Sequence, residues 1–176
     1  MKSIAVYLTI VLAIVFLVPS TGWAAAGFVE KGIYGAYQNT DQVGDGLGAG
    51  IKLTLDAKKV LPAKYDLIGG VDIRGNWTGN YRDDRQLFSL ECIYTIGLDM
   101  HKGLKPYIGV GAGGYIWHSD ADEKHYEADD TLAGNVVFGI EKRVRESTAF
   151  FAEGKYLYGD SALEGFGANI GVNWLW

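Results

Sequence analysis

The segment spanning residues 163–176 alternates between two kinds of side chain. From Phe166 onward every second residue is apolar, and the residues between them are glycine and asparagine until Leu175. A two-residue period predicts a β-strand, because successive side chains of a strand point to opposite faces. The apolar face ends in Trp174 and Trp176. A strand with one apolar face, one small or polar face and aromatic residues at its rim is typical of a transmembrane β-barrel, in which the apolar face meets lipid.

The same alternation recurs along the chain and predicts eight strands in all. They are expected near residues 28–37, 47–55, 65–77, 88–98, 107–117, 132–141, 150–158 and 166–176. An even number of such strands joined in order predicts an all-β fold, an eight-stranded antiparallel up-and-down transmembrane β-barrel.

Lys31 is on the apolar face near the end of its strand, where it can reach the interface. Eight other charged side chains within these strands fall on the face opposite the aliphatic one. They are Glu30, Lys52, Asp72, Arg74, Glu91, Glu141, Glu153 and Lys155. A soluble barrel of the lipocalin type would have the reverse arrangement, with an apolar interior and a polar exterior. We therefore predict that these residues form a polar network in a lumen that is only wide enough for side chains to fill. The network would be either a structural plug or the lining of a narrow pore.

The N-terminal region predicts export. Lys2 precedes an apolar run over residues 4–18, and residues 19–23 (PSTGW) lead from it to the three alanines at 24–26. This run is shorter than the roughly 20 residues that a membrane-spanning helix needs. We expect residues 1–26 to be a cleaved secretory signal peptide and residues 27–176 to be the barrel domain, in the bacterial outer membrane.

The charge and the cysteine content of the chain limit its partners and its covalent cross-links. The chain has 21 acidic and 16 basic side chains, for a formal net charge of −5, which argues against nucleic acid as a partner. Cys92 is the single cysteine, so no internal disulfide can form. Its position on the predicted lipid-facing wall suits a small apolar residue. We expect no cofactor.

The polar connections predict an orientation. With the N-terminus in the periplasm, the connections after the first, third, fifth and seventh strands are extracellular, and we expect these to be the longer ones. The longest polar stretch, residues 118–131, carries an acidic cluster. Its members are His118, Asp120, Asp122, Glu123, His125, Glu127, Asp129 and Asp130. Such oxygen ligands could hold Ca²⁺ or bridge to lipopolysaccharide phosphates, but their spacing matches no EF-hand loop. We predict a solvated acidic loop without a metal site.

Three segments carry a resemblance to a known family. Residues 105–115 read KPYIGVGAGGY, residues 152–156 read AEGKY, and the chain ends in aromatic residues. The chain thereby resembles the small eight-stranded outer-membrane β-barrel superfamily, which includes the OmpA transmembrane domain, OmpX and the opacity-type proteins. The resemblance implies a monomer in contact with outer-membrane lipid and lipopolysaccharide. It also implies recognition by the barrel-assembly machinery through the C-terminal strand, with Trp174 and Trp176 as insertion signal and aromatic rim. The usual last residue of the family is Phe, from which Trp176 departs.

The function that we expect is structural, or an interaction at the cell surface through the extracellular loops. One alternative is a narrow, porin-like ion or solute channel. A second is a lipid A-modifying enzyme, for which His118, Ser119, His125 and Ser161 lie near the predicted extracellular rim. The His-x-Ser pattern of the lipid A deacylases is not present, because Ser119 directly follows His118. We therefore predict no catalytic residues.

Overall fold

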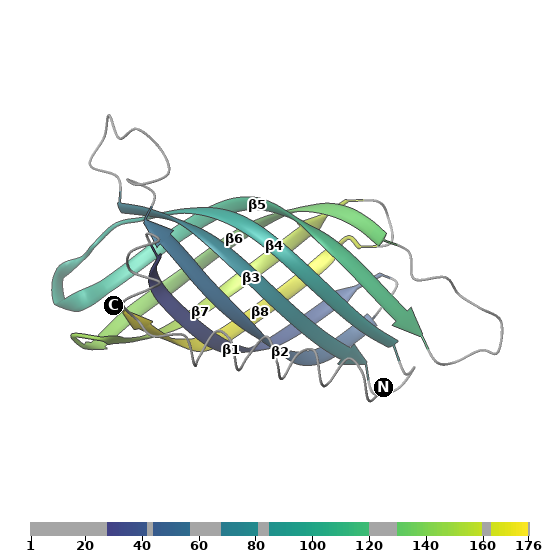
Figure 1. Ribbon diagram of the computed structural model, residues 1–176, viewed down its shortest axis with the longest axis horizontal. Helices are drawn as coiled ribbons and strands as arrows, with labels where there is room; N and C mark the ends of the chain where they lie inside the picture. Colours follow the sequence, from purple (N-terminus) through teal and green to yellow (C-terminus); the bar gives the residue numbers. More distant parts are fainter. Residues whose placement is uncertain are drawn as a thin grey trace.

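The computed structural model describes residues 28–41, 44–56, 68–80, 85–119, 130–159 and 163–175, which form one closed, antiparallel β-barrel (Figure 1). The strands are β1 (Phe28–Thr40), β2 (Gly44–Asp56), β3 (Ile68–Asn80), β4 (Arg85–Gly97), β5 (Leu104–Ser119), β6 (Asp130–Arg145), β7 (Thr148–Tyr158) and β8 (Gly165–Leu175). A single 3₁₀ turn, η1 (His101–Gly103), lies between β4 and β5. The predicted fold class is confirmed. The predicted signal peptide, residues 1–26, lies outside the described residues.

None of the helices in the described part of the chain is long and apolar enough to span a bilayer.

The barrel closes because β1 pairs with β8 as well as with β2. The β1–β8 ladder runs from Glu30 opposite Leu175 to Thr40 opposite Gly165. Following paired residues around the barrel from Glu30 leads back to β1 at Thr40, ten positions further along. For eight strands this stagger requires a tilt of roughly 40° from the barrel axis. The slant of the strands is visible in Figure 1.

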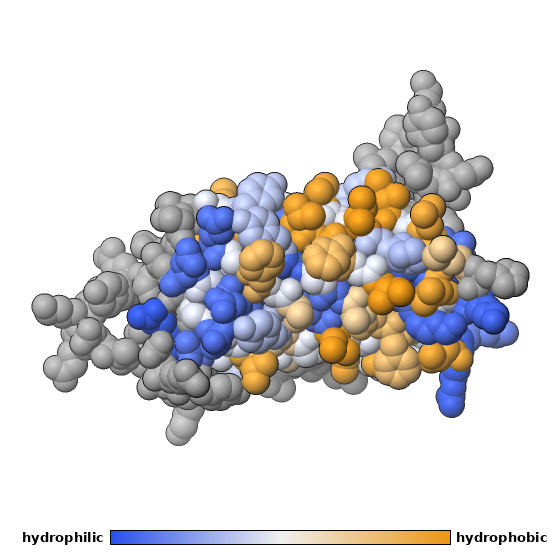
Figure 2. Space-filling view, turned by 180° about the vertical axis from the view of Figure 1, so that it is seen from behind, coloured by the Kyte–Doolittle hydropathy of each residue, from blue (hydrophilic) through white to orange (hydrophobic). Residues whose placement is uncertain are grey.

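The two faces of the wall differ in the way that the alternation predicts. Leu132 and Ile170 are 82% and 71% exposed on the outside, whereas Arg74 and Glu91 are 1% exposed inside. On the face seen in Figure 2, hydrophobic residues gather in a band with hydrophilic residues toward both ends of the barrel. An apolar exterior around a charged interior fits a barrel surrounded by lipid.

Aromatic residues mark the rims of this band. Near the end of the barrel that carries the β3–β4 and β7–β8 connections, Trp77 is opposite Phe88 and Tyr156 is opposite Phe166. The ring centroids of the second pair are 4.9 Å apart. Phe150 is exposed near the other end. Such girdles are found at both interfaces of outer-membrane barrels.

Two lumen glycines allow aromatic rings to cross the interior. A Cβ atom at Gly50 would collide with the ring of Tyr34, and one at Gly139 would collide with the ring of Tyr107. The missing side chains therefore make room for two buried tyrosines in a narrow lumen.

The lengths of the connections differ from those that we predicted. The first connection was expected to span residues 38–46, but β1 continues to Thr40 and β2 begins at Gly44. The added positions are stabilised by side chains, because Tyr37 and Asn39 both donate hydrogen bonds of 2.7 Å to Asp45 Oδ1. The connection between β2 and β3, residues 57–67, is at the opposite end and is longer. The expectation that all longer connections lie at the extracellular end is therefore wrong, because hairpin pairing continues beyond the apolar band.

The structure predicts that arginine is tolerated at the rim of the wall but not at its middle. Ile170 pairs with Gly35 and Ala152 near the middle of three strands. Ile170→Arg should lower the free energy of unfolding by about 2–4 kcal/mol, because a guanidinium is costly at the bilayer midplane. Leu132→Arg, near the end of β6, should cost about 0–1 kcal/mol. Urea titration of the protein refolded in lipid vesicles measures both values, and equal costs would contradict the assigned wall.

Candidate functional site

The eight charged residues of the expected network all lie inside the barrel. Their exposed fractions range from 1% for Arg74 and Glu91 to 7% for Glu30. They are divided into two ion-paired groups in the middle of the lumen and a separate set at the end where both chain termini of the barrel lie. In the orientation expected from the sequence that end faces the periplasm, so we call it the periplasmic end.

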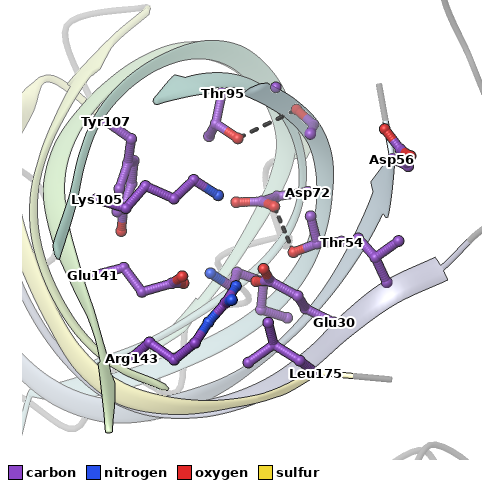
Figure 3. A pocket seen from close by; sticks show the side chains of 14 residues that line it. Glu30, Thr54, Asp56, Asp72, Thr95, Lys105, Tyr107, Glu141, Arg143 and Leu175 are labelled. Carbon is purple, nitrogen blue, oxygen red and sulfur yellow. Dashed lines mark hydrogen bonds between the residues drawn. The ribbon is translucent and has the colours of Figure 1, made fainter. Parts of the chain in front are cut away.

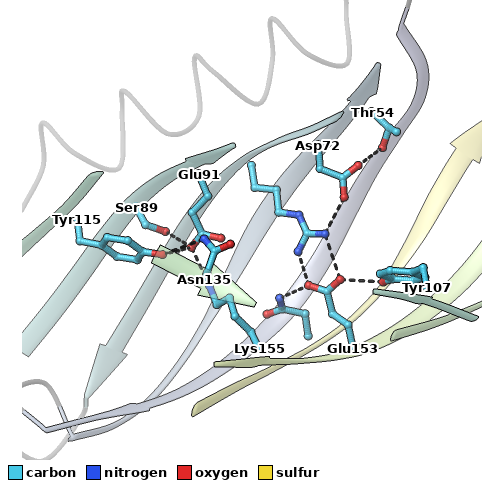
Figure 4. Close-up of polar contacts among 11 residues, drawn as sticks. Thr54, Asp72, Ser89, Glu91, Tyr107, Tyr115, Asn135, Glu153 and Lys155 are labelled. Atoms are coloured by element: carbon cyan, nitrogen blue, oxygen red, sulfur yellow. Dashed lines mark hydrogen bonds and ion pairs between the residues drawn. The ribbon is translucent and has the colours of Figure 1, made fainter. Parts of the chain in front are cut away.

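The first group centres on Arg74, which is held between two carboxylates. Figure 4 labels these carboxylates as Asp72 and Glu153. The Nη2 atom of Arg74 is 2.7 Å from Asp72 Oδ2 and 3.1 Å from Glu153 Oε2, and the Nη1 atom also binds Glu153. Neutral side chains donate further hydrogen bonds to these carboxylates: Thr54 to Asp72 at 2.8 Å, and Tyr107 and Asn169 to Glu153 at 2.7 Å each. A guanidinium with two acidic partners stays charged and fixed in position, because its fork of donors matches carboxylate geometry.

The second group centres on Glu91 and lies further from the periplasmic end. Lys155 Nζ is 2.7 Å from Glu91 Oε1. Ser89 and Tyr115 donate hydrogen bonds of 3.0 and 3.1 Å to the same oxygen, and Asn135 approaches the Tyr115 hydroxyl at 3.5 Å. This group thus links β4, β5, β6 and β7 across the lumen.

An apolar cluster lies beyond the Glu91 group, toward the extracellular end. Its members are Leu87, Tyr115, Ala133, Leu157 and Leu163, each at most 4% exposed. Sequence reasoning missed this cluster, because Leu87 precedes the expected start of its strand and Leu163 falls in an expected loop. Leu87 does share the side of β4 that carries Glu91, four positions away, which was the available signal.

The remaining charges surround a cavity of about 330 Å³ at the periplasmic end (Figure 3). Asn173 Nδ2 donates to Glu30 Oε2 at 3.3 Å and to Glu141 Oε2 at 2.7 Å. Lys52 is 4% exposed, and its Nζ atom is 4.3 Å from the ring centroid of Phe151. Thus one amide connects two acidic residues, and a buried ammonium packs on an aromatic ring.

Several of these hydrogen-bonding residues were not singled out from the sequence. They are Thr54, Ser89, Tyr107, Tyr115, Asn135, Asn169 and Asn173. All of them share the lumen-facing parity of their strands, so the period-two pattern could have included them. Their partners depend on the stagger of the barrel, which the pattern does not contain.

The acidic loop cluster is largely outside the described residues. Residues 120–129 are not described, and β5 and β6 extend to Ser119 and from Asp130, so His118 and Asp130 occupy strand positions and not loop positions. Within the described ranges, no group of three or more His, Cys, Asp or Glu side chains could hold a metal ion. Of the two rim tryptophans, Trp174 pairs with Lys31 and Thr148 in the sheet, and Trp176 is not described.

The Glu91–Lys155 pair should show strong energetic coupling. Lys155→Met leaves Glu91 buried without its cation and should cost about 3–5 kcal/mol of stability. Glu91→Gln should cost a similar amount, because it leaves the ammonium unpaired. The double variant should cost less than the sum by at least about 1 kcal/mol. Unfolding titrations of the cycle measure this coupling. Lys155→Met combined with Glu30→Gln, at the other end of the lumen, is the matched control and should be additive.

In the comparison with known proteins, only solved structures of low sequence identity match, and they support the fold. No protein-family model matches the chain, and no curated protein matches it in sequence. The structure is similar to Neisserial surface protein A, with a TM-score of 0.63 and 16% identity, over 85% of this chain and 96% of that one. It is also similar to OprG from Pseudomonas aeruginosa, with a TM-score of 0.64 and 11% identity, over 84% and 96% of the two chains. For the N-terminal barrel domain of Pseudomonas aeruginosa OprF the TM-score is 0.59 and the identity is 18%, over 85% of this chain and 98% of that one.

Likeness at these identities is a likeness of fold, and it confirms the predicted resemblance at that level. Together with the apolar exterior of the wall, it shows that the chain has the fold of the eight-stranded β-barrels of bacterial outer membranes.

Proposed function

We propose that the protein is a non-conducting barrel with a structural or surface-interaction role exerted through its extracellular loops. The observation that carries this proposal is the filled lumen. Arg74 and Lys155 are paired with carboxylates across the interior, and the cluster around Leu87 and Leu157 lies beyond them. A solute would have to displace both layers, and separating a buried ion pair costs several kcal/mol.

Because the lumen is closed in this proposal, we expect the functional surface to lie at the ends of the barrel. Residues 118–131 contain the densest group of acidic side chains, and we propose this region as the main contact surface. Loops on a rigid scaffold commonly carry binding functions. The name of Neisserial surface protein A places that protein at a surface, which supports our proposal only by analogy of fold.

The immediate partners in this proposal are outer-membrane lipid and lipopolysaccharide around the apolar wall. We further propose that the barrel-assembly machinery recognises β8, with Trp174 at its end. No catalytic group is part of the proposal. The alternative of a lipid A-modifying enzyme would require that deletion of the protein changes the mass of lipid A.

Conductance separates the closed barrel from the channel alternative. Single-channel recording of the refolded protein in planar bilayers should give no steady openings. Arg74→Ala should also be silent, because the apolar cluster around Leu87 remains in place. Insertion is confirmed separately by the altered gel migration of the folded barrel. Steady openings that change in conductance with Arg74→Ala would replace our proposal with a channel.

The loop assignment can be tested without disturbing the barrel. Replacing residues 120–129 by a short Gly-Ser linker removes five acidic side chains and leaves both strands intact. Attachment of cells that produce this variant to a positively charged surface should fall relative to wild type, and the difference should shrink at high salt. Replacement of residues 57–67, at the periplasmic end, by the same linker is the control. Equal attachment by all three cell types would contradict a role for the acidic loop.

A further inference from the structure

The cavity at the periplasmic end is enclosed by side chains from several strands. It measures about 330 Å³, within the range of small-molecule sites, and the Arg74 group lies above it. Its lining comes from β1 to β6 and β8, and includes Thr54, Asp72, Thr95 and Tyr107. Asp72 and Tyr107 are already engaged with Arg74 and Glu153, so they form a fixed floor.

The cavity is unusual because three of its buried charges form no direct ion pair among the described residues. Among the described residues, no carboxylate lies within 4.0 Å of the Lys52 ammonium, and no cation lies within 4.0 Å of Glu30 or Glu141. Lys52, Glu30 and Glu141 are only 4%, 7% and 5% exposed. Elsewhere in the same lumen, Arg74 and Lys155 each have a carboxylate at 2.7 Å. Opposite charges act on them only over longer distances, Lys52 on Glu30, Asp72 and Glu153, and Lys105 on Glu30. A ligand that enters the cavity would give these three groups direct partners.

Two further cations stand at the mouth of the cavity. Lys105 is half-buried and Arg143 is exposed, and neither has an acidic partner within 4.0 Å in the described part of the chain. Figure 3 shows the side chains of Glu30 from β1, Lys105 from β5, and Glu141 and Arg143 from β6 pointing toward the middle of the cavity. Charged groups of both signs thus converge on one space.

We propose that this cavity binds a small zwitterion, an amino-acid-like solute with one ammonium and one carboxylate group. An anion alone would meet Glu30 and Glu141, and a cation alone would meet Lys52, Lys105 and Arg143. A ligand with both charges places its ammonium against the two glutamates and its carboxylate against the cations, so neither set of buried charges is left unpaired. The site faces the periplasm and is closed above, so it is independent of the proposed surface role.

The binding test uses three probes that share a three-carbon skeleton and differ in which charged groups they carry. They are β-alanine as the zwitterion, propionate as the anion and propylammonium as the cation. Each is titrated into the isotopically labelled, refolded full-length barrel, and amide chemical shifts of Gly70 and Thr95 in the cavity lining give the dissociation constants. We expect β-alanine to bind at least tenfold more tightly than either ion. Equal binding of the zwitterion and one ion, or no binding of any probe, would overturn the proposal.

Variants locate the bound charges. Glu141→Gln and Lys52→Met should each weaken β-alanine binding by at least tenfold. Arg143→Gln, at an exposed position where folding is not at risk, should weaken it severalfold. Lys142→Gln is the matched control, because Lys142 neighbours both lining residues on β6 but is exposed and donates to the Lys102 carbonyl at 2.5 Å. If Arg143→Gln and Lys142→Gln bind β-alanine as tightly as wild type does, the charged mouth plays no part and the proposal fails.

Discussion

The structure depends on one constraint, which is that every backbone N–H and C=O group inside the hydrocarbon layer must have a partner within the protein. The ladder between β1 and β8 meets it by joining the first strand of the sheet to the last. Closure with eight strands and a stagger of ten positions fixes the tilt of the wall and leaves an interior that side chains fill. The nature of those side chains then decides what the barrel can do.

Different kinds of side chain fill the lumen along its length. In the middle, Arg74 and Lys155 hold acidic side chains from three strands in ion pairs. Toward the extracellular end, leucines fill the space. At the periplasmic end, Lys52, Glu30 and Glu141 leave a cavity between them. This asymmetry separates the two ends of the protein, so a surface role outside and a binding site on the periplasmic side can coexist without a path between them.

The sequence predicted the wall well because the in-and-out alternation is a local property. The faces of Ile170 and Arg74 follow from their neighbours two positions away, whatever the rest of the barrel does. Strand ends were predicted less well. Hairpins such as β1–β2 continue beyond the apolar band, where Asp45 accepts hydrogen bonds from Tyr37 and Asn39, and polar residues there resemble loop residues in the sequence.

The partners inside the lumen could not be predicted, because they depend on closure and stagger. Arg74 and Glu153 are 79 residues apart, and Asn173 and Glu30 are 143 residues apart. The alternation places both Lys52 and Lys155 in the lumen and does not distinguish between their surroundings. Only the stagger decides that Lys155 meets Glu91 while Lys52 packs on Phe151 beside the cavity. The periplasmic cavity was invisible in the sequence for the same reason.

Spin labels on β8 test most directly whether one face of each strand meets lipid while the other lines the interior. In a Cys92→Ser background, single cysteines placed at successive positions of β8 (Gly165–Leu175) carry the label in lipid vesicles. We expect accessibility to oxygen, which concentrates in the hydrocarbon layer, to oscillate along β8 with a period of two residues. It should be high at Ala168, Ile170 and Val172 and low at the positions between them. A flat profile, or maxima at Asn169 and Gly171, would contradict this assignment of the lipid-facing side.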